Sequence, residues 1–285
     1  MQSLFRGLPI SGEITLRGDL ASRYESRSQI ARILTQEWVG REVPCLACSA
    51  APLTPTAQNT KARDFECPEC SEPYELKASS RRFGRLVPDG EYSTFRSVVG
   101  SDRVPNLLLM EYNRDDLGVR ALLAVHRSLI SDQAIVPRKP LSSKARRAGW
   151  QGCSINMESI PASGRVSVVR DGRALPWPIV TKEWARFEFM VHLRPESRGW
   201  LRDVLSFVQR LAPGPFRLEE VYRFEDELAS LHPANRNIRP KIRQQLQILV
   251  AEGAIPRRAP GRYELFPSGP AAAWPVETLS SGSAR

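Results

Sequence analysis

The sequence predicts a mixed α/β domain followed by a smaller, mainly helical domain. Two apolar runs, residues 106–112 and 118–126, carry one charged side chain each, which is typical of strands in the middle of a sheet that is covered on both faces. After residue 195, three stretches repeat apolar residues at helical spacing. A chain of 285 residues can hold both domains, since single cores seldom grow beyond about 250–300 residues.

The N-terminal part predicts an extension followed by a helix. Residues 1–23 show no sustained periodicity, so we expect an extension without fixed structure. From Ser28 onward, apolar residues recur every three or four positions. Residues 28–41 therefore predict an amphipathic helix with Ser28 as its N-cap.

The next part predicts a loop and a short hairpin. Residues 50–63 are rich in Ala, Pro and Thr and predict a loop. Residues 64–66 and 73–77 look like two short strands on either side of a Cys-Pro-Glu-Cys turn. The turn should therefore be the tip of a hairpin.

The end of the first domain predicts a basic loop and a second hairpin. Residues 137–150 contain five Lys or Arg and no acid, and they end in Ala-Gly-Trp. Residues 165–169 and 179–180 predict a hairpin around Asp171-Gly172, and residues 195–199 predict a linker.

The second domain predicts three helices and a hairpin. Asn237 is a good N-cap for the third helix, Pro240 fits its first turn, and Gly253 is typical of a residue that ends a helix. The hairpin, residues 254–266, has Gly261 near its tip, and this combination predicts a winged helix-turn-helix.

Four domain boundaries follow from these patterns. We expect residues 1–23 to be an N-terminal extension, 24–194 the α/β domain, 195–266 the winged-helix domain, and 267–285 a disordered tail rich in Ser, Ala, Gly and Pro.

Four of the five cysteines have the spacing of a zinc site. Cys45 and Cys48 form one Cys-x-x-Cys pair, Cys67 and Cys70 form another, and Cys153 is left over. Two such pairs can place four thiolates at about 2.3 Å from one Zn²⁺ ion. With four protein ligands the ion would be structural. The alternative, redox-active or merely buried thiols, does not require two pairs at this spacing.

A possible acid/base set straddles the second cysteine pair. Glu75 and Lys77 are two positions apart, so on a strand they project from the same face, and Asp64 lies on the other arm of the predicted hairpin. The two carboxylates and the carbonyl of Leu76 would suit Mg²⁺, and Lys77 would orient or help deprotonate water in phosphodiester hydrolysis. The alternative is a set of solvated charges on a zinc ribbon.

Composition favours a polyanionic partner. Lys and Arg number 41 against 31 Asp and Glu, a formal net charge of +10. No apolar run approaches the roughly 20 residues that span a bilayer, and the start lacks the pattern of a signal peptide, so we expect a cytoplasmic protein without membrane contact. No obligate protein partner is evident.

Two surfaces predict contact with DNA. The third helix has a buried stripe of Ile242, Leu246 and Leu249 and leaves polar side chains of the kinds that read base edges nearer its exposed side. These candidates are Arg239, Lys241, Arg243, Gln244 and Gln247. In the basic loop, Arg146, Arg147 and Trp150 could grip phosphates and contact a base. Solvated polar residues and a packing Trp are the alternatives.

Seven segments between about residue 24 and residue 265 match the motifs of one known family. They are Ser28-Gln-Ile-Ala-Arg-Ile-Leu-Thr35, Asp64-Phe-x-Cys67-x-x-Cys70-Ser-Glu-x-x-Glu75-Leu-Lys77, Lys139-Pro-Leu141, Ala145-Arg-Arg-Ala-Gly-Trp-x-Gly-Cys153, Ser197-Arg-Gly-Trp200, Tyr222-Arg-Phe-Glu225 and Lys241-Ile-Arg-Gln-Gln-Leu-Gln-Ile-Leu249. In these segments the chain resembles the DpnI-type methyl-directed restriction endonucleases. It departs from them in its extension, its longer tail and Pro240.

The resemblance implies a restriction-endonuclease-like PD-(D/E)xK core with an embedded Cys₄ zinc site and a C-terminal winged helix. It implies that Asp64, Glu75 and Lys77 are catalytic and that the substrate is double-stranded DNA with N6-methyladenine in GATC. Trp150 would contact the methyl group, which lies in the major groove. Two alternatives remain: a non-catalytic zinc-ribbon and winged-helix regulator, and a repair nuclease of the same fold.

Overall fold

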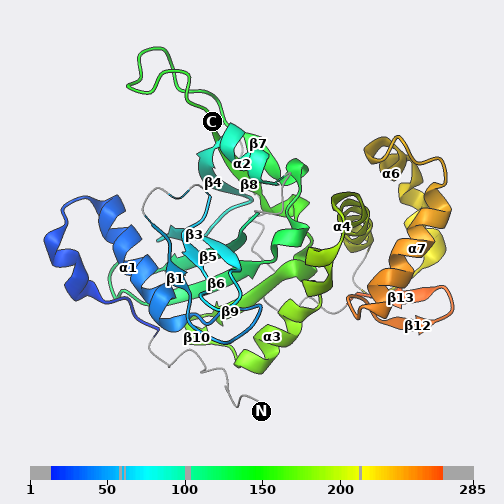
Figure 1. The fold of residues 1–285 in the computed structure, drawn as a ribbon, viewed down its shortest axis with the longest axis horizontal. Helices are drawn as coiled ribbons and strands as arrows, with labels where there is room; N and C mark the ends of the chain where they lie inside the picture. The colour runs from blue at the N-terminus through cyan, green and yellow to red at the C-terminus, as the bar shows by residue number, and fades with distance from the viewer. Residues whose placement is uncertain (1–13, 58–59, 61, 100–103, 212–213, 266–285) are drawn as a thin grey trace, which may run out of the picture.

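The computed structural model describes residues 14–57, 60, 62–99, 104–211 and 214–265, and its centre is a seven-stranded sheet (Figure 1). The two predicted central strands are confirmed as β5 and β6, which pair antiparallel. In the order of the sheet, its strands are β1 (Thr54–Pro55), β2 (Phe65–Glu66), β3 (Pro73–Ser79), β5 (Asn106–Tyr112), β6 (Val119–Val125), β9 (Arg165–Arg170) and β10 (Arg173–Ala174).

Side chains of β5 contribute to two separate hydrophobic cores, because successive residues of a strand point to opposite faces of the sheet. Leu108 and Met110 face a core shared with α1 (Arg27–Glu42) and α3 (Trp177–Ala185). Leu107 and Leu109 face a core covered by α2 (Tyr92–Val99) and a second sheet. That sheet has the order β4 (Leu86–Glu91), β8 (Gly152–Asn156), β7 (Ile135–Pro137). The mixed α/β fold is thus confirmed.

Strands β2 and β3 form the predicted hairpin, with Phe65 opposite Tyr74. Strand β3 then pairs parallel with β5, so that Glu75 lies beside Leu107 and Lys77 beside Leu109. The connection between these parallel strands contains β4 and α2. Glu75 and Lys77 therefore point into the space between the large sheet and the sheet that contains β4.

Part of the predicted extension is fixed to the domain, which corrects that expectation for residues 14–23. The backbone of Leu16 donates a hydrogen bond to the carbonyl of Leu117 (2.9 Å), and Val119 donates one to Ile14 (2.8 Å). Burial of Leu16, which is 3% exposed, explains the ordering. A 3₁₀ turn, η1 (Gly18–Arg23), follows. Residues 1–13 lie outside the described residues.

Helix α1 starts one residue earlier than predicted. Its N-cap is Ser26, and the hydroxyl groups of Ser26 and Ser28 hydrogen-bond each other (2.9 Å) rather than capping the helix. Ser28 is therefore inside the first turn.

Two predictions at the end of the first domain are wrong. Residues 179–180 lie in α3, because Trp177, Val180 and Trp184 bury one helical face; the partner of β9 is β10. Residues 195–199 are the first turn of α4 (Pro195–Arg210), not a linker. Pro195 stands at the first helical position, where its missing N–H costs nothing.

The C-terminal part contains the predicted helices and hairpin, with one irregular segment. The predicted second helix is divided into three short helical segments. A short strand that sequence patterns did not predict, β11, precedes them. In chain order the elements are α4, β11 (Pro215–Arg217), α5 (Leu218–Val221), η7 (Tyr222–Phe224), α6 (Glu225–Leu231), α7 (Ile238–Ala251), β12 (Arg257–Ala259) and β13 (Arg262–Glu264). The predicted tail, 267–285, lies outside the described residues.

The remaining short elements are 3₁₀ turns between the strands of the first domain and, for the last of them, between α3 and α4. They are η2 (Arg127–Leu129), η3 (Asp132–Ala134), η4 (Met157–Ser159), η5 (Ala162–Gly164) and η6 (Glu188–His192). Across the parts of the chain that are described, every helix is too short or too polar to cross a bilayer.

Helix α4 packs against both halves of the molecule, the N-terminal half that ends with η6 and the C-terminal half from β11 to β13. It lies between the large sheet and the elements from α6 to β13 (Figure 1). Its Arg202 donates to the carbonyl of Ile130 (3.3 Å), and Gln209 accepts from the backbone of Ala162 (2.5 Å). On the other side, the Trp200 ring stacks on His232 at 3.8 Å. The two halves thus share one continuous apolar core through α4.

We predict that Leu201→Ala destabilises both halves together. Leu201 is fully buried in the shared core, so its truncation should lower the free energy of unfolding by about 2–5 kcal/mol. Chemical denaturation followed by circular dichroism should show one transition at lower denaturant concentration. Leu231→Ala is the matched control: this leucine is 37% exposed, and we expect a change within about 0.5 kcal/mol. Two separated transitions would contradict a shared core.

Candidate active site and metal centre

Four cysteine sulfurs meet at the tip of the β2–β3 hairpin. Cys45 and Cys48 follow α1, and Cys67 and Cys70 form the hairpin turn. The sulfur atoms of Cys45 and Cys70 are 3.6 Å apart and those of Cys48 and Cys67 are 3.5 Å apart. All four lie within 4.8 Å of one another, and among the residues described they form the one such cluster of three or more potential metal ligands.

The two cysteine pairs have the same backbone shape. The residue after each pair, Ser49 or Ser71, has a positive φ (57° and 59°). Its N–H donates to the carbonyl of the first cysteine, Cys45 (2.8 Å) or Cys67 (2.9 Å). Each pair is therefore a closed turn that directs both thiols to the same side.

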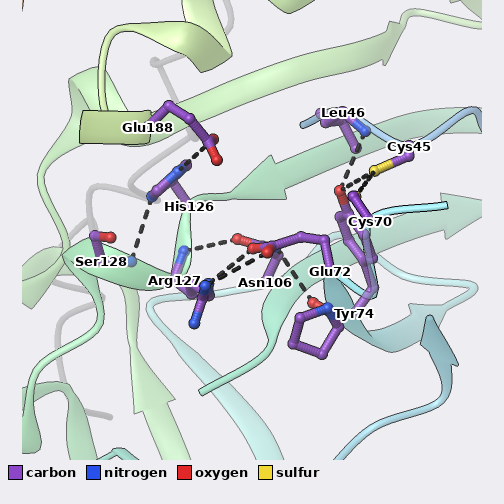
Figure 2. Close-up of polar contacts among 11 residues, drawn as sticks. Cys45, Leu46, Cys70, Glu72, Tyr74, Asn106, His126, Arg127, Ser128 and Glu188 are labelled. Atoms are coloured by element: carbon purple, nitrogen blue, oxygen red, sulfur yellow. Dashed lines mark hydrogen bonds and ion pairs between the residues drawn. The ribbon is translucent and has the colours of Figure 1, made fainter. Parts of the chain in front are cut away.

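The cluster fits a tetrahedral zinc ion. A Zn–S bond of about 2.3 Å corresponds to sulfur–sulfur distances of roughly 3.8 Å, close to those in the cluster. The hydroxyl of Tyr74 accepts a hydrogen bond from the Leu46 N–H (3.1 Å) and lies 3.3 Å from the Cys45 sulfur (Figure 2). Burial raises the pKa of the Cys45 thiol to about 12, so the thiolate form needs a cation's charge.

A buried polar cluster ties the hairpin tip to the sheet. Glu72 accepts hydrogen bonds from the Asn106 amide (2.8 Å) and from the Arg127 guanidinium (2.7 Å). The Arg127 N–H in turn donates to the Asn106 side chain (2.9 Å; Figure 2). These contacts join the start of β3 to the start of β5 and the end of β6.

The structure brings Asp64, Glu75 and Lys77 to one end of the hairpin. The Leu76 N–H donates to one carboxylate oxygen of Asp64 (2.9 Å), and the Gln36 amide of α1 donates to the other (3.3 Å). The Lys77 ammonium donates to Glu75 (2.7 Å), whose side chain is 10% exposed. Gln36 was not predicted, because its position in α1 carries no signal in a single sequence.

A third carboxylate, Asp89 of β4, completes this group and was also not predicted. The Lys77 ammonium donates to Asp89 at 2.5 Å, and the Gly90 N–H donates to the same oxygen at 2.5 Å. Pro88 and Gly90 flank Asp89, and because both residue types are uncommon inside strands, the sequence does not predict a strand here. Only the pairing of β4 with β8 reveals its position.

The group carries an excess of negative charge that suits a divalent cation. Three carboxylates and one ammonium leave two formal negative charges. Burial raises the pKa of Glu75 to about 7. The charge of Lys77 opposes this rise, and the charges of Asp89 and Asp64 add to it. One oxygen each of Glu75 and Asp89 is buried without a hydrogen-bond partner among the described residues. Hard oxygen ligands of this kind fit Mg²⁺, and Asp64, Glu75 and the Leu76 carbonyl could hold it.

The basic loop between β7 and β8 projects from the domain (green, Figure 1). Arg146 and Arg147 are exposed, Trp150 is half-buried, and the Arg147 guanidinium lies over the Trp150 ring at 4.8 Å. A Cβ atom at Gly152 would come within 2.9 Å of that ring, so this close packing requires glycine. Gly152 pairs with β4, which links the loop to the strand that contains Asp89.

The third helix of the C-terminal half, α7, buries the predicted apolar stripe. Ile242, Leu246 and Leu249 have no exposed surface. Arg243, Gln244 and Gln247 are exposed. The two remaining candidates are partly engaged within the protein. The Arg239 guanidinium pairs with Glu225 (2.6 Å), and the Lys241 ammonium donates to Gln244 (2.9 Å).

Comparison with protein families gives two matches that together span most of the chain. The family described as DpnI, the Dam-replacing family, matches residues 13–193. The family described as the Dam-replacing HTH domain matches residues 196–265. The boundary between the two matches falls just before α4 or at its first residues.

We predict that the purified chain binds one zinc ion per molecule and that Cys45→Ser releases it. Cys45 is buried and supplies one of four converging sulfurs. Its loss should remove the metal link between the hairpin tip and the loop after α1, and so lower the thermal midpoint of unfolding. Elemental analysis after dialysis measures the metal. Cys153→Ala is the control, because this buried thiol lies outside the cluster. Equal zinc content in wild type and Cys45→Ser would contradict the assignment.

Proposed function

This chain belongs to the Dam-replacing family (DpnI), and from that premise we propose that it is a type II methyl-directed restriction endonuclease. The family membership implies a nuclease that acts on DNA, and the HTH domain implies DNA binding. Our proposal adds the substrate, double-stranded DNA with N6-methyladenine in GATC, and the mechanism, Mg²⁺-dependent phosphodiester hydrolysis in a PD-(D/E)xK core with structural Zn²⁺.

The observation that carries the proposal is the convergence of Asp64, Glu75 and Lys77 at one end of the β2–β3 hairpin. In the reaction, Asp64 and Glu75 would hold Mg²⁺ together with the Leu76 carbonyl. Bound there, Mg²⁺ supplies charge stabilisation to the scissile phosphate and lowers the pKa of a water molecule. Lys77 would hold that water in line with the phosphorus atom through its ammonium group.

Two surfaces support sequence recognition. In the first domain, we propose that the Trp150 ring contacts the N6-methyl group while Arg146 and Arg147 bind phosphates. The support is their position: Trp150 lies two residues before the start of β8, which pairs with the strand of Asp89. In the HTH domain, Arg243, Gln244 and Gln247 are the exposed candidates for base contacts, and Arg239 and Lys241 are candidates for phosphate contacts.

We predict that, with Mg²⁺, the protein cuts a plasmid from a host that methylates adenine in GATC and leaves the unmethylated plasmid intact. The reason is the methyl contact proposed for Trp150. Agarose electrophoresis measures linear product over time. Equal cutting of both plasmids would remove the methyl dependence and favour a repair nuclease. Binding without any cutting would instead favour a regulator.

We predict that Lys77→Ala reduces cleavage of the methylated plasmid by on the order of 10²- to 10⁴-fold, the usual loss of a group that assists proton transfer. Zinc content and DNA affinity should not change, because Lys77 contacts neither the sulfur cluster nor the exposed face of α7. Single-turnover cleavage, elemental analysis and a gel-shift assay are the measurements. Lys182→Ala in α3 is the matched control and should cleave normally. Full activity of Lys77→Ala would exclude this lysine from the reaction.

A further inference from the structure

We infer that Asp89 is a positioning residue for the proposed cleavage reaction: it holds the Lys77 ammonium at the reaction centre while Glu75 binds the metal ion. The inference rests on the proposed function and adds a residue outside the motif that carries the catalytic set. Asp89 lies on β4, a strand of the second sheet, so its contribution depends on how the two sheets pack.

The Lys77 ammonium lies between two carboxylates that come from different sheets. It is 2.7 Å from Glu75, its neighbour on β3, and 2.5 Å from Asp89. The Asp89 side chain is 1% exposed, and its bonded oxygen also accepts the Gly90 N–H at 2.5 Å. That second bond fixes the carboxylate independently of Lys77. Asp89 is therefore a fixed anchor, and Lys77 is the side chain that it orients.

A metal ion on Glu75 would compete with Lys77 for the same carboxylate. The two positive charges would repel each other, and without a second partner the flexible lysine side chain would turn toward solvent. Asp89 supplies that partner from a strand of the other sheet. A buried carboxylate is costly unless it is paired, and Asp89 accepts hydrogen bonds from Lys77 and from Gly90. Holding Lys77 is the role that its contacts support.

The alternative role for Asp89 is direct metal binding, since one of its oxygens is buried without a hydrogen-bond partner among the described residues. The two roles differ in a measurable way. A ligand contributes to metal affinity, whereas a residue that acts through Lys77 contributes to the cleavage rate alone.

The test compares Asp89→Ala and Asp89→Asn in the full chain with wild type. Removing this charge leaves Lys77 paired with Glu75, so we expect both variants to fold with thermal midpoints close to that of wild type. Single-turnover cleavage of adenine-methylated plasmid with Mg²⁺ gives the rate. Calorimetric titration with Mn²⁺ alone gives the metal affinity, a readout independent of activity.

Asp203→Asn in α4 is the matched control. Asp203 is also a largely buried carboxylate paired with basic side chains, but its partners are His232 and Arg202 rather than the catalytic group. We expect this variant to have a lower thermal midpoint with an unchanged cleavage rate. The Asp89 variants should show the opposite pattern.

We expect Asp89→Ala to slow cleavage by on the order of 10²-fold, as a misplaced catalytic group does, with unchanged Mn²⁺ affinity. Asp89→Asn keeps an acceptor for Lys77 and should lose less activity; it also decides the outcome if Asp89→Ala does not fold. A wild-type rate in these variants would overturn the inference, as would a parallel loss of Mn²⁺ affinity, which identifies a ligand.

A wild-type protein that cuts no DNA overturns the proposed function itself, whereas active wild type with equally active variants overturns the Asp89 role alone.

Discussion

The position of the β2–β3 hairpin determines the rest of the functional site. Its tip is tied to the loop after α1 by the convergence of four cysteine sulfurs, and to the start of β5 and the end of β6 through Glu72. Asp64 precedes one arm, and Glu75 and Lys77 lie on the other. Because the tip is fixed to two other parts of the domain, and the Asp64 carboxylate accepts the Leu76 N–H, the two arms hold their carboxylates side by side. A short two-residue strand such as β2 could not do this alone.

The charges of the site follow from where the hairpin docks. Two sheets face each other across Lys77, one contributing Glu75 and the other Asp89. Burial makes each carboxylate costly, and one ammonium cannot neutralise all three. The packing of these carboxylates therefore carries an electrostatic cost, and burial, together with Asp89 and Asp64, raises the pKa of Glu75. Such a cost is typical of a site arranged for a charged ligand.

Sequence patterns predicted what depends on local spacing and missed what depends on packing. The apolar runs of β5 and β6 and the stripe of α7 were predicted because their periodicity reflects burial directly. The cysteine pairs were recognisable because metal geometry restricts spacing. Asp89 was missed because Pro88 and Gly90 hide its strand, and Gln36 because it reaches the site from a helix 28 residues before Asp64. Residues 195–199 were misassigned because Pro and Gly usually signal a linker, whereas Pro195 here begins a helix.

The sharing of α4 between the two halves has a consequence for how the protein would read a long duplex. Because α4 packs in the core that both halves share, the basic loop and the exposed face of α7 are mounted on one body and are not connected by a flexible tether. If both are DNA-contact surfaces, as proposed, they would have a fixed separation and a fixed rotation about the axis of the duplex. A duplex whose two binding sites have the matching spacing would contact both surfaces at once. The loss of translational and rotational entropy would then occur once rather than twice. DNA with its two sites out of phase would have to bend or twist to reach both surfaces, so under the proposed function the spacing of sites would affect binding.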